Sequence, residues 1–86
     1  MYYLYVLQCN DKTLYTGITI DLERRVTEHN SSKAGAKYTK GRRPVKLVYV
    51  KKFIDRSTAS RAEYHFKQLT RSKKLQLLNT STDDLS

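Results

Sequence analysis

The segment YYLYVLQC, Tyr2–Cys9, is apolar on both of its alternating faces, and this limits what the chain can fold into. Tyr3, Tyr5 and Leu7 share one face, and the residues between them form the other. A strand with two apolar faces has to be covered on both sides, as happens when helices pack over a sheet. The segment therefore predicts a strand inside a layered structure rather than a one-sided sheet.

A β-hairpin is predicted next, because the turn signal NDK is followed by the strand-like run TLYTGIT. A three-residue loop would pair Cys9 with Thr13 and place Tyr5 opposite Gly17. In that register Tyr5 and Tyr15 share a face as diagonal neighbours, whereas a loop of two or four residues would separate them. The loop length therefore decides whether the two tyrosines lie together.

Hydrophobic periodicity predicts one more strand and three helices after the hairpin. A helix capped by Thr19 or Asp21 should end at about residue 29 or 30, and a third strand should follow over residues 45–53. Ser57 is the expected cap of a second helix, and a short third helix should start at Ser72. The order β-β-α-β-α-α predicts an α/β (α+β) domain with a small antiparallel sheet flanked by helices. We expect one domain over residues 1–80 and a frayed polar tail over 81–86.

The charge of the chain favours a polyanionic partner. Its 86 residues include 17 Lys and Arg against 8 Asp and Glu, a formal charge of +9. Nucleic acid is the first expectation and an anionic membrane surface the second, with an incidentally charged soluble protein as the alternative. Much of the charge lies in the loop-like segment SSKAGAKYTKGRRP and just after it. Around one stacking ring, Tyr38, the cations expected to hold a phosphate backbone are Lys33, Lys37, Lys40, Arg42, Arg43 and Lys46.

Several classes of protein are not supported by the sequence. Cys9 is the single cysteine, so the chain forms no internal disulfide and no cysteine metal cluster. No apolar run approaches the roughly 18 residues of a membrane span, and the N-terminus has no signal-peptide pattern. We expect a cytoplasmic protein with no membrane association.

Four polar residues fall on faces that the periodicity marks as apolar: Tyr5, Tyr15, Arg25 and Glu63. Arg25 lies within the apolar stripe of the first helix, whereas Arg24 and Glu28 should face outward as a pair. One explanation is a buried stabilising network in which Arg25 pairs with Glu63. The other is a functional site, since convergent titratable groups are typical of such sites. The residue pattern leaves both open.

As a site, this set suits phosphodiester hydrolysis. An arginine can hold the scissile phosphate and offset charge in the transition state. A lone carboxylate is a reasonable ligand for Mg²⁺, which keeps most of its waters. A tyrosine, or His29 near the end of the first helix, can accept the proton of the attacking water. No second ligand stands at metal-binding spacing from His29, so a zinc site is not expected.

The order of four motifs resembles the GIY-YIG nuclease superfamily. The motifs are YLY at Tyr3–Tyr5, YTG at Tyr15–Gly17, and the helical segments DLERRVTEH and AEYHFKQL. With GAKYTKGRRPVKLVY, nearly the whole chain is similar to the small stand-alone bacterial proteins of this superfamily. The resemblance implies a three-stranded antiparallel sheet flanked by helices, and cleavage of DNA that depends on one divalent ion, Mg²⁺ or Mn²⁺.

The resemblance also implies roles for individual residues. Tyr5 and Tyr15 match the tyrosines of the paired motifs, and Arg25 matches the family arginine. His29 matches a histidine found in many members, and Glu63 matches the metal-binding glutamate. These five residues form the expected catalytic set, with Glu63 as the metal ligand.

Some positions depart from the family pattern. Tyr3 stands where glycine is usual, and Ile18 stands where some members carry a lysine that assists the base. The general base is therefore open among Tyr5, Tyr15 and His29. The chain has no separate DNA-binding domain, which implies either weak sequence specificity or a protein partner that supplies it. A structure-directed DNA endonuclease is the main hypothesis, with DNA favoured over RNA. The alternatives are a non-catalytic nucleic-acid-binding module that keeps the fold, and a purely structural protein.

Overall fold

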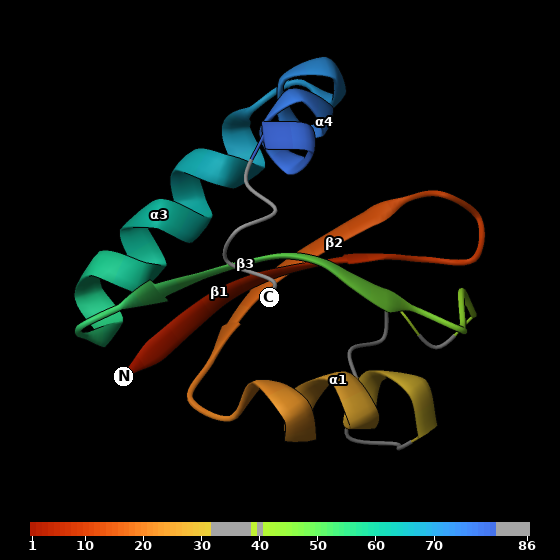
Figure 1. Cartoon of the computed structure of the whole chain (residues 1–86), viewed down its shortest axis with the longest axis horizontal. Coiled ribbons are helices and arrows are strands. Elements are labelled where there is room, and N and C mark those ends of the chain that lie inside the picture. Colours follow the sequence, from red (N-terminus) through yellow and green to blue (C-terminus); the bar gives the residue numbers. More distant parts are fainter. Residues whose placement is uncertain (32–38, 40, 81–86) are drawn as a thin grey trace.

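A sheet of three antiparallel strands lies between helices on its two faces (Figure 1). The computed structural model describes residues 1–31, 39 and 41–80. In chain order the elements are β1 (Tyr2–Gln8), β2 (Leu14–Thr19), α1 (Leu22–Ser31), β3 (Lys46–Phe53), α3 (Arg56–Gln68) and α4 (Arg71–Thr80). The strand order across the sheet is β2-β1-β3. The predicted fold class and element order are confirmed, and the predicted tail at 81–86 lies outside the described residues.

The central strand β1 is buried on both faces, as its sequence predicted. On one face Leu4 and Val6 pack with Tyr49 and Phe66, under α3. On the other face Tyr5 and Leu7 form a second core with Cys9 and Val45, and residues of α1 pack against it. Figure 1 shows α1 on one side of the sheet and α3 and α4 on the other. The layered arrangement follows from the two apolar faces of this one strand.

The β1–β2 hairpin has the register of a three-residue loop. The backbone N–H of Cys9 donates to the carbonyl oxygen of Thr13 at 2.8 Å, and Tyr5 lies opposite Gly17. Within the loop Lys12 has a φ of 72°, the left-handed conformation that closes the turn. This register puts Tyr5 and Tyr15 on the same face, as the three-residue alternative required.

Helix α1 is capped at its start by Asp21, one of the two predicted residues. The Asp21 carboxylate accepts a hydrogen bond from the Arg24 backbone N–H at 3.2 Å. The helix ends at Ser31, slightly later than predicted, with the Ser31 hydroxyl bonded to the Thr27 carbonyl at 2.8 Å. Helix α1 therefore starts where the cap predicted and is longer at its end.

Three predicted boundaries are wrong, and two of them have a visible local cause. Asp55 rather than Ser57 caps α3, because its carboxylate accepts the Thr58 backbone N–H at 2.8 Å. Helix α4 starts one residue before Ser72. Strand β3 starts after Val45, because the Asn30 side chain binds the backbone N–H of Val45 at 2.7 Å and its carbonyl at 3.0 Å. A side-chain clamp therefore takes the place of the first ladder bonds.

The helices are short, with 10 residues in α1, 13 in α3 and 10 in α4. In the part of the chain that the structure describes, no helix is both long enough and apolar enough to cross a membrane.

Candidate active site

Tyr5 occupies the space that Gly17 leaves open. The two residues lie opposite each other in β1 and β2. A Cβ atom on residue 17 would stand 2.6 Å from the Tyr5 hydroxyl oxygen and 2.8 Å from Cζ, closer than real Cβ atoms approach. The backbone at Gly17 does not need glycine for a positive φ. Its glycine is therefore required for the close approach of the Tyr5 ring and not for a turn.

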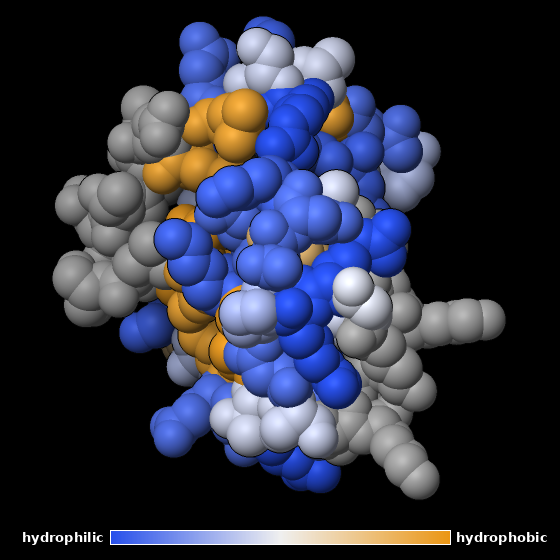
Figure 2. All heavy atoms as spheres, turned by 90° about the vertical axis from the view of Figure 1, so that its right-hand side faces the viewer, coloured by the Kyte–Doolittle hydropathy of each residue, from blue (hydrophilic) through white to orange (hydrophobic). Residues whose placement is uncertain are grey.

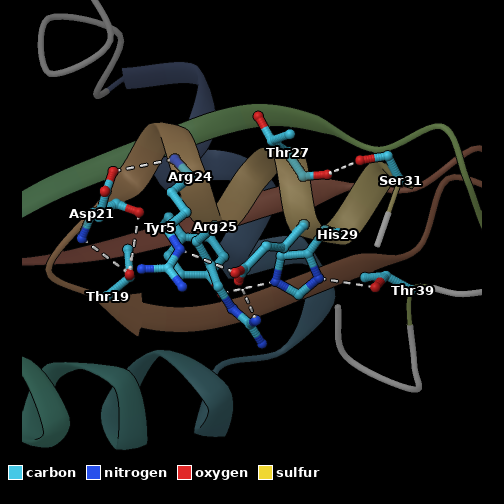
Figure 3. Close-up of polar contacts among 10 residues, drawn as sticks. Tyr5, Thr19, Asp21, Arg24, Arg25, Thr27, His29, Ser31 and Thr39 are labelled. Carbon is cyan, nitrogen blue, oxygen red and sulfur yellow. Dashed lines mark hydrogen bonds and ion pairs between the residues drawn. The ribbon is translucent and has the colours of Figure 1, made fainter. Parts of the chain in front are cut away.

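Three buried side chains form a hydrogen-bonded chain next to this contact (Figure 3). The Tyr5 hydroxyl oxygen lies 3.0 Å from His29 Nε2, and His29 Nδ1 lies 2.9 Å from Thr39 Oγ1. Tyr5 is 1% exposed, and His29 and Thr39 are both 0% exposed. Because its two ring nitrogens are buried and engaged, His29 is placed to act on Tyr5 rather than directly on solvent.

The guanidinium of Arg25 gives this chain a direction. Its side chain hydrogen-bonds the side chain of Tyr5. A guanidinium has donors only, so the Tyr5 oxygen accepts from Arg25 and directs its own proton at His29 Nε2. His29 then carries its ring proton on Nδ1, which donates to Thr39 Oγ1. The order of donation is Arg25 to Tyr5, Tyr5 to His29, and His29 to Thr39.

The resting protein keeps the shared proton on Tyr5. Burial raises the pKa of Tyr5 to about 12, although the hydrogen bond from Arg25 opposes this. Burial, and then the positive charge of Arg25, lower the pKa of His29 to about 4. Both shifts favour a neutral tyrosine beside a neutral imidazole at neutral pH. The hydrogen bonds therefore hold the side chains of Tyr5, His29 and Thr39 in orientation, and the proton stays on Tyr5 until the charge around them changes.

Tyr15 joins the same cluster from β2. Its ring centroid lies 6.4 Å from that of Tyr5 and 5.0 Å from that of His29. Its side chain is half-buried, so it lies between the buried chain and solvent. The predicted meeting of the two tyrosines is confirmed, and His29 is packed against both rings.

Arg25 faces inward from α1, whereas its neighbour Arg24 does not. The Arg25 side chain is 28% exposed and its Nη1 lies 2.9 Å from Glu28 Oε1. Arg24 is 75% exposed and binds the other oxygen of Glu28 at 3.2 Å. The predicted i, i+4 pair of Arg24 and Glu28 is confirmed, but Glu28 is only 21% exposed and also holds Arg25. Figure 3 shows the Arg25 side chain among those of Tyr5 and His29.

Glu63 lies on α3, on the other side of the sheet from α1. Helix α3 contacts β2, and the negative charge of Glu63 contributes to the raised pKa of Tyr5. The carboxylate is 24% exposed and pairs with Lys67 at 3.3 Å on its own helix. A single accessible carboxylate fits a Mg²⁺ ion that keeps most of its waters. Within the described ranges, no three His, Cys, Asp or Glu side chains gather as a metal-binding group.

The basic segment after α1 is described only at its end. Arg42 Nε lies 3.1 Å from Asp11 Oδ2, and Arg43 Nε donates to the His29 carbonyl oxygen at 2.6 Å. Lys46 is exposed at the start of β3. The predicted backbone-binding residues Lys33, Lys37, Tyr38 and Lys40 lie outside the described residues. Figure 2, which faces the end of the molecule with the β1–β2 hairpin, shows a largely hydrophilic surface.

The structure thus brings together Tyr5, Tyr15, Arg25 and His29, four of the five predicted catalytic residues, and the charge of Glu63 acts on Tyr5. Sequence reasoning missed two contributors to this arrangement, Thr39 and the backbone contact of Arg43. Thr39 is a small polar residue in a polar segment, and nothing in the sequence marks it as buried against His29. Only the path of the chain reveals that contact.

Comparison with known proteins agrees with this geometry. The model of the GIY-YIG catalytic domain family matches residues 1–76, which include every residue of the cluster. The UPF0213 protein of Desulfotalea psychrophila is 52% identical over 99% of this chain and 77% of its own length. The UPF0213 protein of Syntrophus aciditrophicus is 49% identical over 94% of this chain and 93% of its own.

Solved structures are similar as well. The solution NMR structure of the UPF0213 protein from Bacillus halodurans is 46% identical, with a TM-score of 0.61 over 93% of this chain and 85% of that one. The solution NMR structure of a protein from E. faecalis is 52% identical, with a TM-score of 0.64 over 92% of this chain and 83% of that one. Motifs, fold and family model agree, and the chain belongs to the GIY-YIG nuclease family, among its small stand-alone UPF0213 members.

Proposed function

We propose that this protein is a divalent-metal-dependent endonuclease that hydrolyses DNA phosphodiester bonds with weak sequence specificity. The observation that carries the proposal is that the Tyr5 hydroxyl hydrogen-bonds two residues of α1, Arg25 and His29. An inward-facing arginine can bind a phosphate and stabilise its charge. A buried tyrosine–histidine pair beside it can accept the proton of an attacking water.

Arg25 would hold the scissile phosphate. Its guanidinium already spans the Glu28 carboxylate and the Tyr5 hydroxyl, so a bound phosphate would exchange one anionic partner for another. Arg24, which is 75% exposed, lies outside this site and binds the other oxygen of Glu28. Arg25 would then offset the charge that builds on the phosphoryl oxygens.

Tyr5 would accept the proton of the attacking water and pass its own proton to His29 Nε2. The pKa of about 4 at His29 opposes this transfer in the resting protein, partly because of the charge of Arg25. A phosphodiester bound at Arg25 offsets that charge and makes His29 a better acceptor. Thr39 Oγ1 accepts a hydrogen bond from the Nδ1–H group and so would stabilise the imidazolium that results. Proton transfer is in this way coupled to substrate binding.

Glu63 would hold the divalent ion at the edge of the cluster. When bound, a divalent cation supplies stabilisation of the negative charge on the leaving oxygen. Tyr15, half-buried against His29, would line the water site. Lys67 competes for Glu63, since it lies 3.3 Å from Oε2. Titration with Mg²⁺ by calorimetry should therefore give tighter binding in Lys67→Ala and weaker binding in Glu63→Gln.

A nucleic-acid-binding module without catalysis is the second candidate. It is favoured by the single carboxylate at the site and its pairing with Lys67. Purified protein incubated with supercoiled and branched DNA, with Mg²⁺, with Mn²⁺ or with a chelator, separates the two. Nicking that requires metal and is lost in Arg25→Ala supports the nuclease. Salt-sensitive binding with no metal-dependent nicking supports the module and contradicts the nuclease.

A further inference from the structure

The layer formed by α3 and α4 carries much of the positive charge of the protein. Residues 56–80 contain six of the 17 Lys and Arg residues and one of the eight acidic residues. The one acidic residue, Glu63, belongs to the candidate active site and pairs with Lys67. Figure 1 shows this layer on the face of the sheet opposite α1. It is therefore a separate basic surface from the segment that follows α1.

An exposed tyrosine stands within this surface. Tyr64 is 63% exposed, while Tyr5 and Tyr49 are buried in the two cores. Its ring lies edge-on to that of His65, with centroids 5.9 Å apart. His65 is exposed as well. Because most of its surface is exposed, the Tyr64 ring is accessible to a ligand that stacks on aromatic faces.

Helical spacing places polar and cationic groups beside that ring. Arg61, Tyr64 and Gln68 follow one another at i, i+3 and i+7, and all three are exposed. The buried residues Ala59 and Phe66 point to the sheet from the other side of the helix. The outer face of α3 thus presents a stacking ring between a guanidinium and an amide. Arg71 and Lys73, both exposed, continue the positive charge onto α4.

We propose that the outer face of α3, with the start of α4, binds single-stranded nucleic acid, and that Tyr64 stacks on an unpaired base. Positive charge alone would suit any polyanion, including duplex DNA or an anionic membrane. The exposed ring selects a single strand, because bases in a duplex are already stacked and present no free face. Tyr64 is also adjacent in α3 to Glu63, the member of the candidate active site that this helix supplies.

This inference deepens the proposed function. Binding of the strand does not depend on that function, whereas its role in directing cleavage does. A strand held by Tyr64 would direct cleavage to DNA with an unpaired segment. Binding itself does not require catalysis, so the test uses the full chain with a chelator and no divalent metal. The probes are a fluorescein-labelled single strand and the duplex formed with its complement, followed by fluorescence anisotropy.

Tyr64→Ala should weaken binding of the single strand about 5- to 150-fold and that of the duplex less than about twofold. Tyr64→Phe, which keeps the ring, should bind the single strand as the wild type does. Ile54→Ala, an 81%-exposed apolar residue just before α3, is the matched control and should change neither affinity. Arg61→Ala should reduce the salt dependence for the single strand by about 0.7 in log–log slope.

Unchanged single-strand affinity in Tyr64→Ala, or an equal loss for single strand and duplex, would overturn the inference. Binding to anionic vesicles that is lost in Tyr64→Ala, without single-strand binding, would also overturn it. Failure of the proposed function looks different. In that case wild-type protein shows no metal-dependent cleavage, while the Tyr64-dependent affinity for the single strand persists.

Discussion

Gly17 and Tyr5 form a complementary pair across β1 and β2, in which the missing side chain of one makes room for the ring of the other. The tyrosine hydroxyl reaches His29 and Arg25 only because residue 17 has no Cβ. The glycine of the YTG motif is therefore part of the site through the space that it leaves.

Gly17→Ala should displace the Tyr5 ring. Overpacking of this kind typically costs about 1–3 kcal/mol of unfolding free energy, and the loss of the Tyr5–His29 contact should reduce cleavage as well. Gly41→Ala is the matched control, since a Cβ there meets nothing within 4 Å. Urea unfolding measures both variants. Equal stability of Gly17→Ala and wild type would contradict the close contact.

The protonation of His29 should make stability depend on pH. Its pKa is lowered from 6.5 to about 4 in the folded protein, so between these values the unfolded chain binds the proton and the folded chain does not. Stability is therefore full above about pH 6.5 and falls as the pH drops towards 4, by roughly 3 kcal/mol. His29→Gln should remove most of this dependence. An unchanged pH profile in that variant would contradict a neutral buried imidazole.

The direction of the hydrogen-bonded chain fixes a tautomer. We expect His29 to carry its proton on Nδ1, because Nε2 accepts from Tyr5. Nitrogen NMR shifts of the ring distinguish the two forms. Thr39→Val, which removes the acceptor of that proton, should destabilise the protein and reduce cleavage. A proton on Nε2 in the wild type would reverse the proposed direction of transfer.

Tyr5→Phe should separate the role of the hydroxyl from that of the ring. The variant keeps the packing next to Gly17 but leaves His29 Nε2 without its partner from Tyr5. Loss of a proton-transfer group typically reduces a rate by about 10²–10⁴. Tyr3→Phe, at a half-buried tyrosine in the same strand, serves as the control. Cleavage by Tyr5→Phe at the wild-type rate would assign the proton transfer to another group.

The caps of α3 offer a test of the fold that is independent of function. Asp55→Ala should lower the urea midpoint of unfolding, because the Asp55 carboxylate accepts the Thr58 backbone N–H. Ser57→Ala, at the residue that the sequence favoured, should change the midpoint little. A larger effect at Ser57 than at Asp55 would contradict the observed start of the helix.

The sequence predicted well what depends on periodicity. The two apolar faces of β1 were predicted, and Tyr5 was expected beside Tyr15 in one of the possible loop registers, that of three residues, which the structure has. The helical spacing was enough to turn Arg25 inward. These features are local, since each depends on residues close in the chain.

Contacts between distant segments were not predictable in the same way. Thr39 meets His29 across ten positions, and the Asn30 clamp holds Val45 across fifteen. Asp55 and Ser57 are both residue types that cap helices well, and only the backbone geometry selects Asp55. Periodicity carries no information about such choices.

The central claim is that Arg25 and Glu63 work together with Tyr5 in metal-dependent hydrolysis. The most direct measurement is the initial rate at which purified protein nicks supercoiled DNA in Mg²⁺ or Mn²⁺. Arg25→Ala and Glu63→Ala are compared with Arg24→Ala and Glu23→Ala, which make the same charge changes at exposed positions of α1. We expect nicking by wild type and both controls, and its loss by at least about 10² in the two site variants. Equal nicking by Arg25→Ala and Arg24→Ala, or none by the wild type with either metal, would contradict the account.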